Sequence, residues 1–161
     1  MRNTYFLFLL VVFVGCKGEA QQKKVTVKKG YPINKTDAEW KEELSDMAYY
    51  VLRRAGTERA FTGKLNKVYD PGTYVCAACN VPLYASENKY DSRSGWPSFD
   101  RGFDKNLEYD VDHKLGYART ELKCNNCGGH LGHMFMDGPR KTTGERHCIN
   151  SAALNFIPTN E

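Results

Sequence analysis

The sequence lacks three features that would place it in a familiar class of protein. Its longest apolar run, residues 5–14, is shorter than the roughly 20 residues that a membrane-spanning helix needs. It contains no internal repeat or low-complexity tract, which excludes a repeat architecture. Residues 36–161 carry 16 Lys and Arg against 18 Asp and Glu, which argues against the basic patch of a nucleic-acid-binding surface. The 161 residues, 41% of them apolar, suffice for one domain with a buried core.

The first sixteen residues predict export. Arg2 precedes the apolar run, which has the length of a signal-peptide core. The Gly15-Cys16 step resembles a bacterial lipobox, in which the cysteine is lipidated and becomes the new N-terminus; an ordinary secretory signal with an incidental Cys16 is the alternative. Residues 17–35 hold six Lys against one Glu and suit a flexible tether. The prediction is a lipoprotein anchored to a membrane, facing the periplasm or the cell surface.

The folded domain is expected to span residues 36–161 and to begin with a helix. Thr36-x-x-Glu39 is the pattern of a capping box. Four apolar residues then recur at helical spacing: Trp40, Leu44, Met47 and Val51. The helix is expected to end at Gly56. Beyond Gly63, short runs of Tyr, Val and Phe alternate with turn-forming Asp, Gly and Pro. This pattern predicts small antiparallel sheets joined by loops.

Four of the six cysteines form two CxxC pairs, Cys76 with Cys79 and Cys124 with Cys127. Four thiolates are the ligand set of a closed tetrahedral zinc site, which stabilises a fold and has no open position for substrate. Two disulfides, or a redox-active pair, are the alternatives in an exported protein. Zinc is favoured because both pairs lie in turn-forming contexts and neither is placed like a redox CxxC, which opens a helix. A sizeable fold must bring the pairs together, because 44 residues separate Cys79 from Cys124.

Cys148 remains as the candidate nucleophile. A cysteine is reactive near neutral pH only where cationic or hydrogen-bonding groups favour its thiolate. If the surrounding stretch is a strand, Arg146, Cys148 and Asn150 share one face. His130 and His133 are separated by two residues, one of them glycine, and we expect their rings to converge from a loop as proton donors. Surface positions, or ligation of zinc, are the alternatives for these histidines.

Trp96 is followed by proline, which holds it in an extended conformation. A tryptophan fixed in this way is suited to forming the wall of a pocket for a small apolar group. A place in the hydrophobic core is the alternative.

Together the motifs resemble one family in their identity and order. They are Phe61-Thr62-Gly63, Cys76-x-x-Cys79, Lys89-Tyr90-Asp91-Ser92, Gly95-Trp96-Pro97-Ser98-Phe99, Cys124-x-x-Cys127, Gly129-His130-Leu131-Gly132-His133-Met134-Phe135, Asp137-Gly138-Pro139, Thr143-Gly144-Glu145-Arg146-His147-Cys148-Ile149-Asn150-Ser151-Ala152 and Leu154-x-Phe156. Residues 36–157 thus resemble the B-type peptide-methionine sulfoxide reductases. The resemblance implies a mainly β fold of two antiparallel sheets of the β-tent type, with N-terminal helices and one structural zinc. It also implies a monomeric enzyme that reduces the R epimer of methionine sulfoxide in proteins and as the free amino acid.

The resemblance also implies roles for single residues. Cys148 attacks the sulfoxide sulfur and becomes a sulfenic acid, the first step of thiol oxidation. His130 or His133 donates a proton to the sulfoxide oxygen. Arg146 and Asn150 set the state of the thiolate and its approach to the substrate.

The pocket for the substrate methyl group falls to Trp96, with Phe135 as a second wall. Many members of the family carry a resolving cysteine just before the Gly-Trp-Pro-Ser-Phe motif, and here that place is Ser94. The resemblance therefore implies that Cys148 is recycled by an external thiol, from a thioredoxin-like protein or a small reductant.

Two functions of other classes are the alternatives. One is a non-catalytic, membrane-anchored zinc-binding module for protein interaction, which would not need the Arg146, Cys148 and Asn150 face together with two histidines. The other is a thiol sensor of oxidants, which would usually keep a resolving cysteine beside the reactive one.

Overall fold

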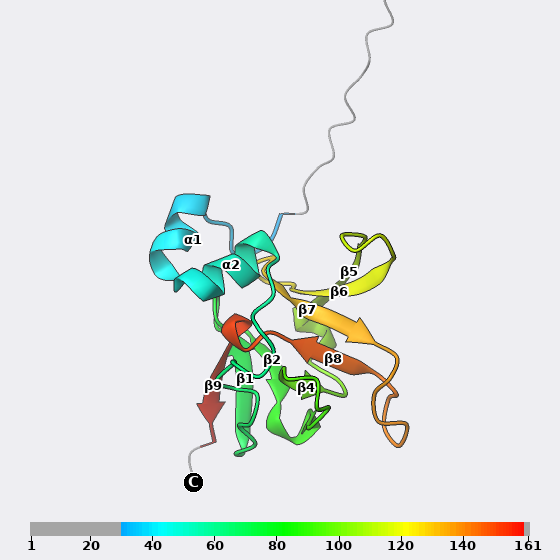
Figure 1. The fold of residues 1–161 in the computed structure, drawn as a ribbon. Helices are drawn as coiled ribbons and strands as arrows, with labels where there is room; N and C mark the ends of the chain where they lie inside the picture. The colour runs from blue at the N-terminus through cyan, green and yellow to red at the C-terminus, as the bar shows by residue number, and fades with distance from the viewer. Residues whose placement is uncertain (1–29, 160–161) are drawn as a thin grey trace, which may run out of the picture.

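The computed structural model describes residues 30–159, which form the domain shown in Figure 1. The predicted signal sequence, Cys16 and most of the predicted tether lie outside these residues. No helix in the described part of the chain has the length and apolar character needed to cross a membrane.

Two short helices open the domain, α1 (Asp37–Glu43) and α2 (Asp46–Arg54). The predicted capping box is present at α1: the Thr36 hydroxyl accepts from the Glu39 amide, and the Glu39 carboxylate accepts from the Thr36 amide at 2.7 Å. Ser45 caps α2 by accepting from the amide of Ala48 at 3.3 Å. Serine at this position satisfies an amide that the first turn of a helix leaves without a partner.

The prediction of one continuous helix up to Gly56 is wrong. Leu44 takes an extended conformation between the helices, and the Ser45 cap then starts α2 in a new direction. Met47 is therefore 48% exposed, although the periodic pattern had placed it on the buried face with Trp40 and Val51. The chain leaves α2 through Ala55, which has the left-handed conformation that usually favours glycine.

Two antiparallel sheets make up the rest of the domain, as the resemblance implied. The smaller sheet has three strands in the order β2-β1-β9: β2 (Pro82–Ala85), β1 (Gly72–Cys76) and β9 (Leu154–Pro158). The larger sheet has six strands in the order β3-β4-β8-β7-β6-β5: β3 (Lys89–Tyr90), β4 (Ser98–Phe99), β8 (Arg146–Ile149), β7 (His130–Phe135), β6 (Arg119–Cys124) and β5 (Leu107–Asp112). Three 3-10 turns accompany them: η1 (Ser86–Asn88), η2 (Asp104–Asn106) and η3 (Ser151–Ala153).

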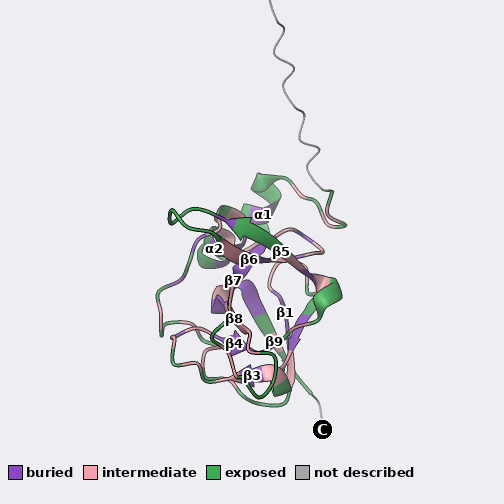
Figure 2. Cartoon of the chain, turned by 90° about the vertical axis from the view of Figure 1, so that its right-hand side faces the viewer, coloured by how far each residue is buried: buried purple, intermediate pink, exposed green. Residues whose placement is uncertain are grey.

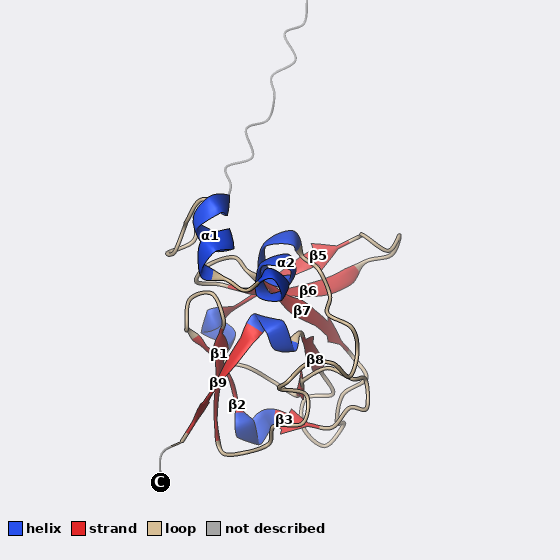
Figure 3. Cartoon of the chain, turned by 60° about the vertical axis from the view of Figure 1, so that its left-hand side comes forward, coloured by secondary structure: helices blue, strands red, loops and turns tan. Residues whose placement is uncertain are grey.

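The helices lie together at one end of the two sheets, with α2 packed against β7 and η3 (Figure 3). Aromatic rings join the sheets, because Tyr84 of β2 stacks on Phe99 of β4 with ring centroids 4.2 Å apart. His147 of β8 is fully buried beside them, and its Nδ1 lies 3.3 Å from the Tyr84 hydroxyl. Buried residues line the interior between the sheets, while the end of the β5–β6 hairpin is exposed (Figure 2). This packing makes β8 a rigid support for the residues on its outer face.

Candidate active site and metal cluster

Strand β8 carries Cys148 on a face that points away from the core. His147 and Ile149 are fully buried, whereas Arg146 and Cys148 are partly exposed, as the period-two pattern predicted. Asn150 follows the strand and is held by two hydrogen bonds. Its Oδ1 accepts from the Glu58 amide at 3.0 Å, and its Nδ2 donates to the Leu131 carbonyl at 2.9 Å.

A cavity of about 120 Å³ opens beside Cys148. We call it the Cys148 cavity, and its lining residues are Thr57, Trp96, Arg119, Gly132, His133, Phe135, Cys148 and Asn150. Five of the predicted site residues therefore meet in one place. Arg146 does not line this cavity. Its guanidinium lies over the Phe135 ring, 4.4 Å from the ring centroid, and makes a bidentate pair with Asp137 at 2.8 and 2.9 Å.

The two histidines lie on strand β7, so the prediction of a loop is wrong. His133 stands directly opposite Cys148 in the β7–β8 ladder. Residues three apart normally face opposite sides of a strand, but Leu122 pairs with Gly132 while Lys123 pairs with His130. Leu131 is thus an extra residue, a β-bulge that brings both rings to one side. The ring centroids of His130 and His133 are 5.3 Å apart.

Asp112 fixes the orientation of His133. Its carboxylate lies 2.8 Å from His133 Nε2 and also pairs with Arg119, its partner across the β5–β6 ladder. Burial lowers the pKa of His133, although Asp112 opposes that shift. The pKa of Asp112 is held well below its usual range, first by the Lys114 amide and then by His133 and Arg119. Asp112 is therefore a carboxylate that can stabilise a proton on His133.

His130 lies behind His133 and does not line the Cys148 cavity. Its Nδ1 is 2.6 Å from a Glu121 carboxylate oxygen, and its Nε2 is buried without a hydrogen-bond partner among residues 30–159. The geometry thus separates the two histidines. His133 lines the cavity, whereas His130 is paired with Glu121 outside it.

Cys148 is half-buried, and its sulfur touches a hydroxyl. Burial raises the pKa of the thiol, while Ser94 and Arg146 act in the opposite direction. The Ser94 hydroxyl lies 3.8 Å from Cys148 Sγ and is itself 2.8 Å from the Ser92 hydroxyl. The raised pKa of Cys148 and the lowered pKa of His133 both favour a neutral thiol beside a neutral imidazole.

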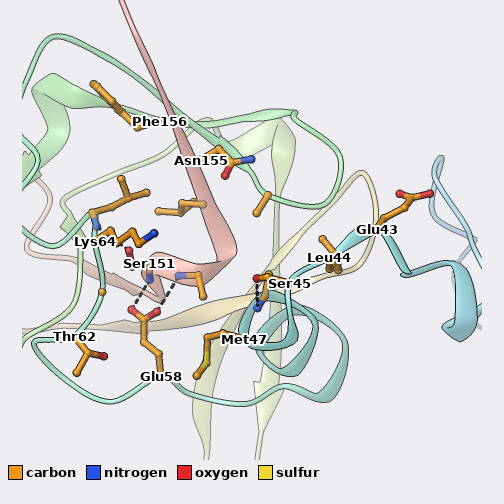
Figure 4. Close-up of a pocket in the computed structure, with 16 residues that line it drawn as sticks. Glu43, Leu44, Ser45, Met47, Glu58, Thr62, Lys64, Ser151, Asn155 and Phe156 are labelled. Carbon is orange, nitrogen blue, oxygen red and sulfur yellow. Dashed lines mark hydrogen bonds between the residues drawn. The ribbon is translucent and has the colours of Figure 1, made fainter. Parts of the chain in front are cut away.

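Glu58 links the walls of the Cys148 cavity. Its carbonyl accepts from Trp96 Nε1 at 3.1 Å, and its amide donates to Asn150. Its buried carboxylate accepts from the amides of Ser151 at 2.6 Å and Ala152 at 2.9 Å, which Figure 4 shows as dashed lines. The carboxylate faces a separate groove of about 710 Å³, and none of the predicted catalytic residues lines that groove.

The four paired cysteines converge on one point away from the Cys148 cavity. Their sulfurs lie within 4.8 Å of one another, with Cys76 and Cys127 at 3.8 Å and Cys79 and Cys124 at 3.5 Å. No disulfide is present in the described part of the chain, and these distances exceed the roughly 2.05 Å of an S–S bond. Four thiolates bound at about 2.3 Å around a tetrahedral zinc would lie about 3.8 Å apart. The donor set and its spacing therefore fit a metal ion.

The two CxxC turns have the same backbone design. The amide of Asn80 donates to the Cys76 carbonyl at 2.8 Å, and the amide of Gly128 donates to the Cys124 carbonyl at the same distance. Both Asn80 and Gly128 have positive φ angles, 57° and 70°. Cys76 ends β1 of the smaller sheet and Cys124 ends β6 of the larger one, so a bound metal would tie the two sheets together.

No pattern in the sequence predicted a role for four residues of the site: Asp112, Arg119, Glu58 and Thr57. No local pattern marks the first two, because their contact depends on the register of the β5–β6 hairpin and on the bulge at Leu131. The carboxylate of Glu58 contacts the amides of Ser151 and Ala152, which lie more than ninety positions further along the chain. Such long-range contacts appear only in the folded structure.

The chain is similar to proteins of one known family. The family model described as the SelR domain matches residues 44–158. A protein of Leptospira interrogans serogroup Icterohaemorrhagiae serovar Lai (strain 56601), named peptide methionine sulfoxide reductase MsrB, is 54% identical over 127 residues, which are 78% of this chain and 96% of the relative. Proteins of the same name are 49% identical in Burkholderia ambifaria (strain MC40-6), covering 80% of this chain and 90% of theirs, and 48% identical in Burkholderia cenocepacia (strain HI2424), covering 83% and 95%. The chain therefore belongs to the MsrB family of peptide methionine sulfoxide reductases, whose SelR domain it carries.

Proposed function

We propose that this chain reduces the R epimer of methionine sulfoxide in proteins to methionine, with Cys148 as the nucleophile and an external thiol as the reductant. Membership of the MsrB family makes the chain an oxidoreductase that acts on methionine sulfoxide. The proposed mechanism and epimer preference are supported by the Cys148 cavity, in which a thiol, an imidazole and two aromatic walls meet.

The cavity residues divide the work of the first half-reaction. Trp96 and Phe135 enclose the apolar methyl group, and Asn150 fixes one side of the space. The Cys148 sulfur attacks the sulfoxide sulfur, which is electrophilic only when its oxygen is protonated or strongly hydrogen-bonded, and an S–S bond forms. The oxygen then passes to the Cys148 sulfur as this S–S bond and the original S–O bond break, so that methionine leaves and Cys148 becomes a sulfenic acid.

The proton that the oxygen needs is already in the site. The resting thiol carries it, and His133 stands across the ladder to receive it and pass it to the oxygen. Asp112 stabilises the transient imidazolium. Thiol and sulfoxide then become sulfenic acid and sulfide with no net uptake of protons. Because His133 lines the cavity and His130 does not, we assign the acid role to His133.

We propose that the cysteine cluster holds one zinc ion through Cys76, Cys79, Cys124 and Cys127. The spacing of the four sulfurs supports this assignment. A closed Cys₄ zinc site stabilises a fold and takes no part in the reaction.

Discrimination between epimers tests the proposed function. The cavity offers its apolar walls and its proton donor at fixed places, so only one hand of the sulfoxide can present the methyl group and the oxygen to both. We expect turnover of N-acetyl-methionine-R-sulfoxide with dithiothreitol to exceed that of the S epimer by at least about 100-fold, which corresponds to about 2.7 kcal/mol. Chromatography of the product from each pure epimer measures the ratio. Equal turnover of the two epimers would show that the proposal is wrong.

We further propose that Cys16 is lipidated and anchors the domain to a membrane. Support comes from the apolar run of residues 5–14 and the Gly15-Cys16 step. In cell fractions, we expect the wild type in the membrane pellet and the Cys16→Ala variant in the soluble exported fraction, because acyl chains provide the anchor. Finding both proteins in the soluble fraction would leave only a secretory signal.

A further inference from the structure

Cys148 lines the cavity that the attack on methionine sulfoxide uses, and its neighbour Ser94 lines a second cavity. The second has a volume of about 500 Å³ and is lined by Tyr90, Ser92, Ser94, Asp137, Gly138, Pro139 and Arg146. We call it the Ser94 cavity. Ser94 contributes to its lining, and the Ser94 hydroxyl lies 3.8 Å from Cys148 Sγ. A single small side chain therefore stands between this cavity and the reactive sulfur.

The second half-reaction needs an approach that differs from the first. The oxygen of the sulfenic acid comes from the substrate, so it points into the Cys148 cavity. An incoming thiolate displaces that oxygen most readily from the opposite side of the sulfur. A new S–S bond forms as the S–O bond breaks, and the oxygen leaves as water after taking up one proton. A second thiolate of the reductant then attacks the mixed disulfide at the reductant's sulfur, which releases Cys148 as thiolate and the reductant as its disulfide.

The lining of the Ser94 cavity suits a polar thiol. Hydroxyls come from Tyr90, Ser92 and Ser94, and the guanidinium of Arg146 supplies positive charge near the sulfur. The Tyr90 hydroxyl is buried and has no hydrogen-bond partner in the part of the chain that the structure describes. Its proton is therefore not committed to another group of the described residues.

The barrier at Ser94 is small. The Ser94 hydroxyl has one hydroxyl partner, Ser92 at 2.8 Å, besides the sulfur itself. Rotation about the Cα–Cβ bond between staggered positions moves this hydroxyl aside. The substrate side is walled instead by Trp96 and Phe135. These large rings cannot be displaced as easily.

We propose that the Ser94 cavity is the entry site for the thiol reductant, a small hydrophilic thiol or dithiol that attacks the sulfenic acid of Cys148 from the Ser94 side. The proposal rests on the proposed function, because it concerns the intermediate which that function creates. A dithiol on a reductant protein offers the same attacking group as a small dithiol. Comparing the rates of reduction by dithiothreitol and by a thioredoxin shows whether this cavity accepts the small dithiol, the protein dithiol or both.

The test separates the two half-reactions. One equivalent of N-acetyl-methionine-R-sulfoxide, added without reductant, should convert Cys148 to a sulfenic acid, which a trapping reagent and mass spectrometry quantify. Rapid mixing with dithiothreitol then gives the rate constant of its reduction. If no sulfenic acid forms, the proposed function fails before the entry site is tested.

Two cavity-filling variants should have opposite effects. Pro139→Phe places a ring in the Ser94 cavity, and Thr57→Phe places the same ring at the Cys148 cavity. We expect Pro139→Phe to slow the reduction by dithiothreitol at least tenfold, and to slow it more than it slows the oxidation step. Thr57→Phe should slow oxidation more than reduction. Equal slowing of both steps by Pro139→Phe, or no slowing of the reduction, would overturn the proposal.

A competition experiment on the wild type keeps the proposal testable if a variant fails to fold. N-acetyl-methionine at saturating concentration occupies the Cys148 cavity during the second half-reaction. The rate of reduction by dithiothreitol should then change by less than twofold. Competitive slowing by this sulfide would place the thiol in the Cys148 cavity and contradict entry from the Ser94 side.

Discussion

Replacing Cys148 with serine should abolish reduction of methionine sulfoxide, with a loss on the order of 10³-fold or more. A hydroxyl is a far weaker nucleophile than a thiolate, and nothing else in the Cys148 cavity can accept the oxygen. The metal content and the melting temperature of Cys148→Ser should stay close to those of the wild type, because the side chain is small and lies on the outer face of β8. Steady-state turnover with dithiothreitol measures the loss. Appreciable turnover by a folded Cys148→Ser protein would refute the mechanism.

A single turnover without reductant adds a second readout on the same cysteine. In the wild type, the sulfenic acid on Cys148 should persist until a thiol arrives, since no other cysteine of the described chain lines either cavity. Ser94→Cys is the matched control, because its sulfur would replace a hydroxyl that lies 3.8 Å from Cys148 Sγ. This variant should trap the oxidised state as a disulfide between positions 94 and 148. A disulfide from Cys148 to any of the four clustered cysteines in the wild type would overturn their structural role.

Removal of the metal should strongly destabilise the domain. The cluster joins the end of β1 to the end of β6, so it ties the smaller sheet to the larger one. Binding of zinc to four thiolates contributes directly to folding free energy, and on the order of 10 kcal/mol is available from such sites at neutral pH. In Cys79→Ser, we expect loss of bound zinc and a fall in melting temperature of about 10 °C or more, which corresponds to a few kcal/mol in a domain of this size.

Metal analysis and thermal unfolding of the two serine variants measure this prediction together. Cys148→Ser should retain zinc and lose activity, whereas Cys79→Ser should lose both zinc and stability. A Cys79→Ser protein that melts at the wild-type temperature, or a wild type purified without metal and equally stable, would contradict the structural role of the cluster.

The parts of the structure that could be predicted depend on residues that lie close together in the sequence. A period of two placed Arg146 and Cys148 on one face of β8, and the two CxxC spacings predicted a four-sulfur cluster. The capping box at Thr36 was also visible in the sequence. In each case, the residues concerned lie within a few positions of one another, so local backbone geometry decides the outcome.

The predictions that failed concern places where two local signals compete, or contacts between residues far apart in the sequence. Ser45 caps a second helix at a point where the apolar pattern had favoured one continuous helix. The bulge at Leu131 lets two histidines share a face on a strand, although regular alternation would separate them. Asp112 reaches His133 only through pairing across three strands, β5, β6 and β7. No periodic pattern in a single sequence encodes such pairings.

The position of β9 bears on the order in which this domain assembles. β1, the central strand of its sheet, pairs with β9, so Gly72 meets Pro158 from the far end of the described chain. Proteins dominated by contacts between distant segments fold slowly, because a long loop must close before those contacts form. Until β9 is added, the end of β1 that carries Cys76 lacks one of its two neighbours. If the domain folds in an oxidising compartment, as the proposed export implies, this delay leaves the five thiols of the described residues open to incorrect pairing. Early capture of the metal would protect four of them, and the remaining one is the thiol that the enzyme must keep reactive.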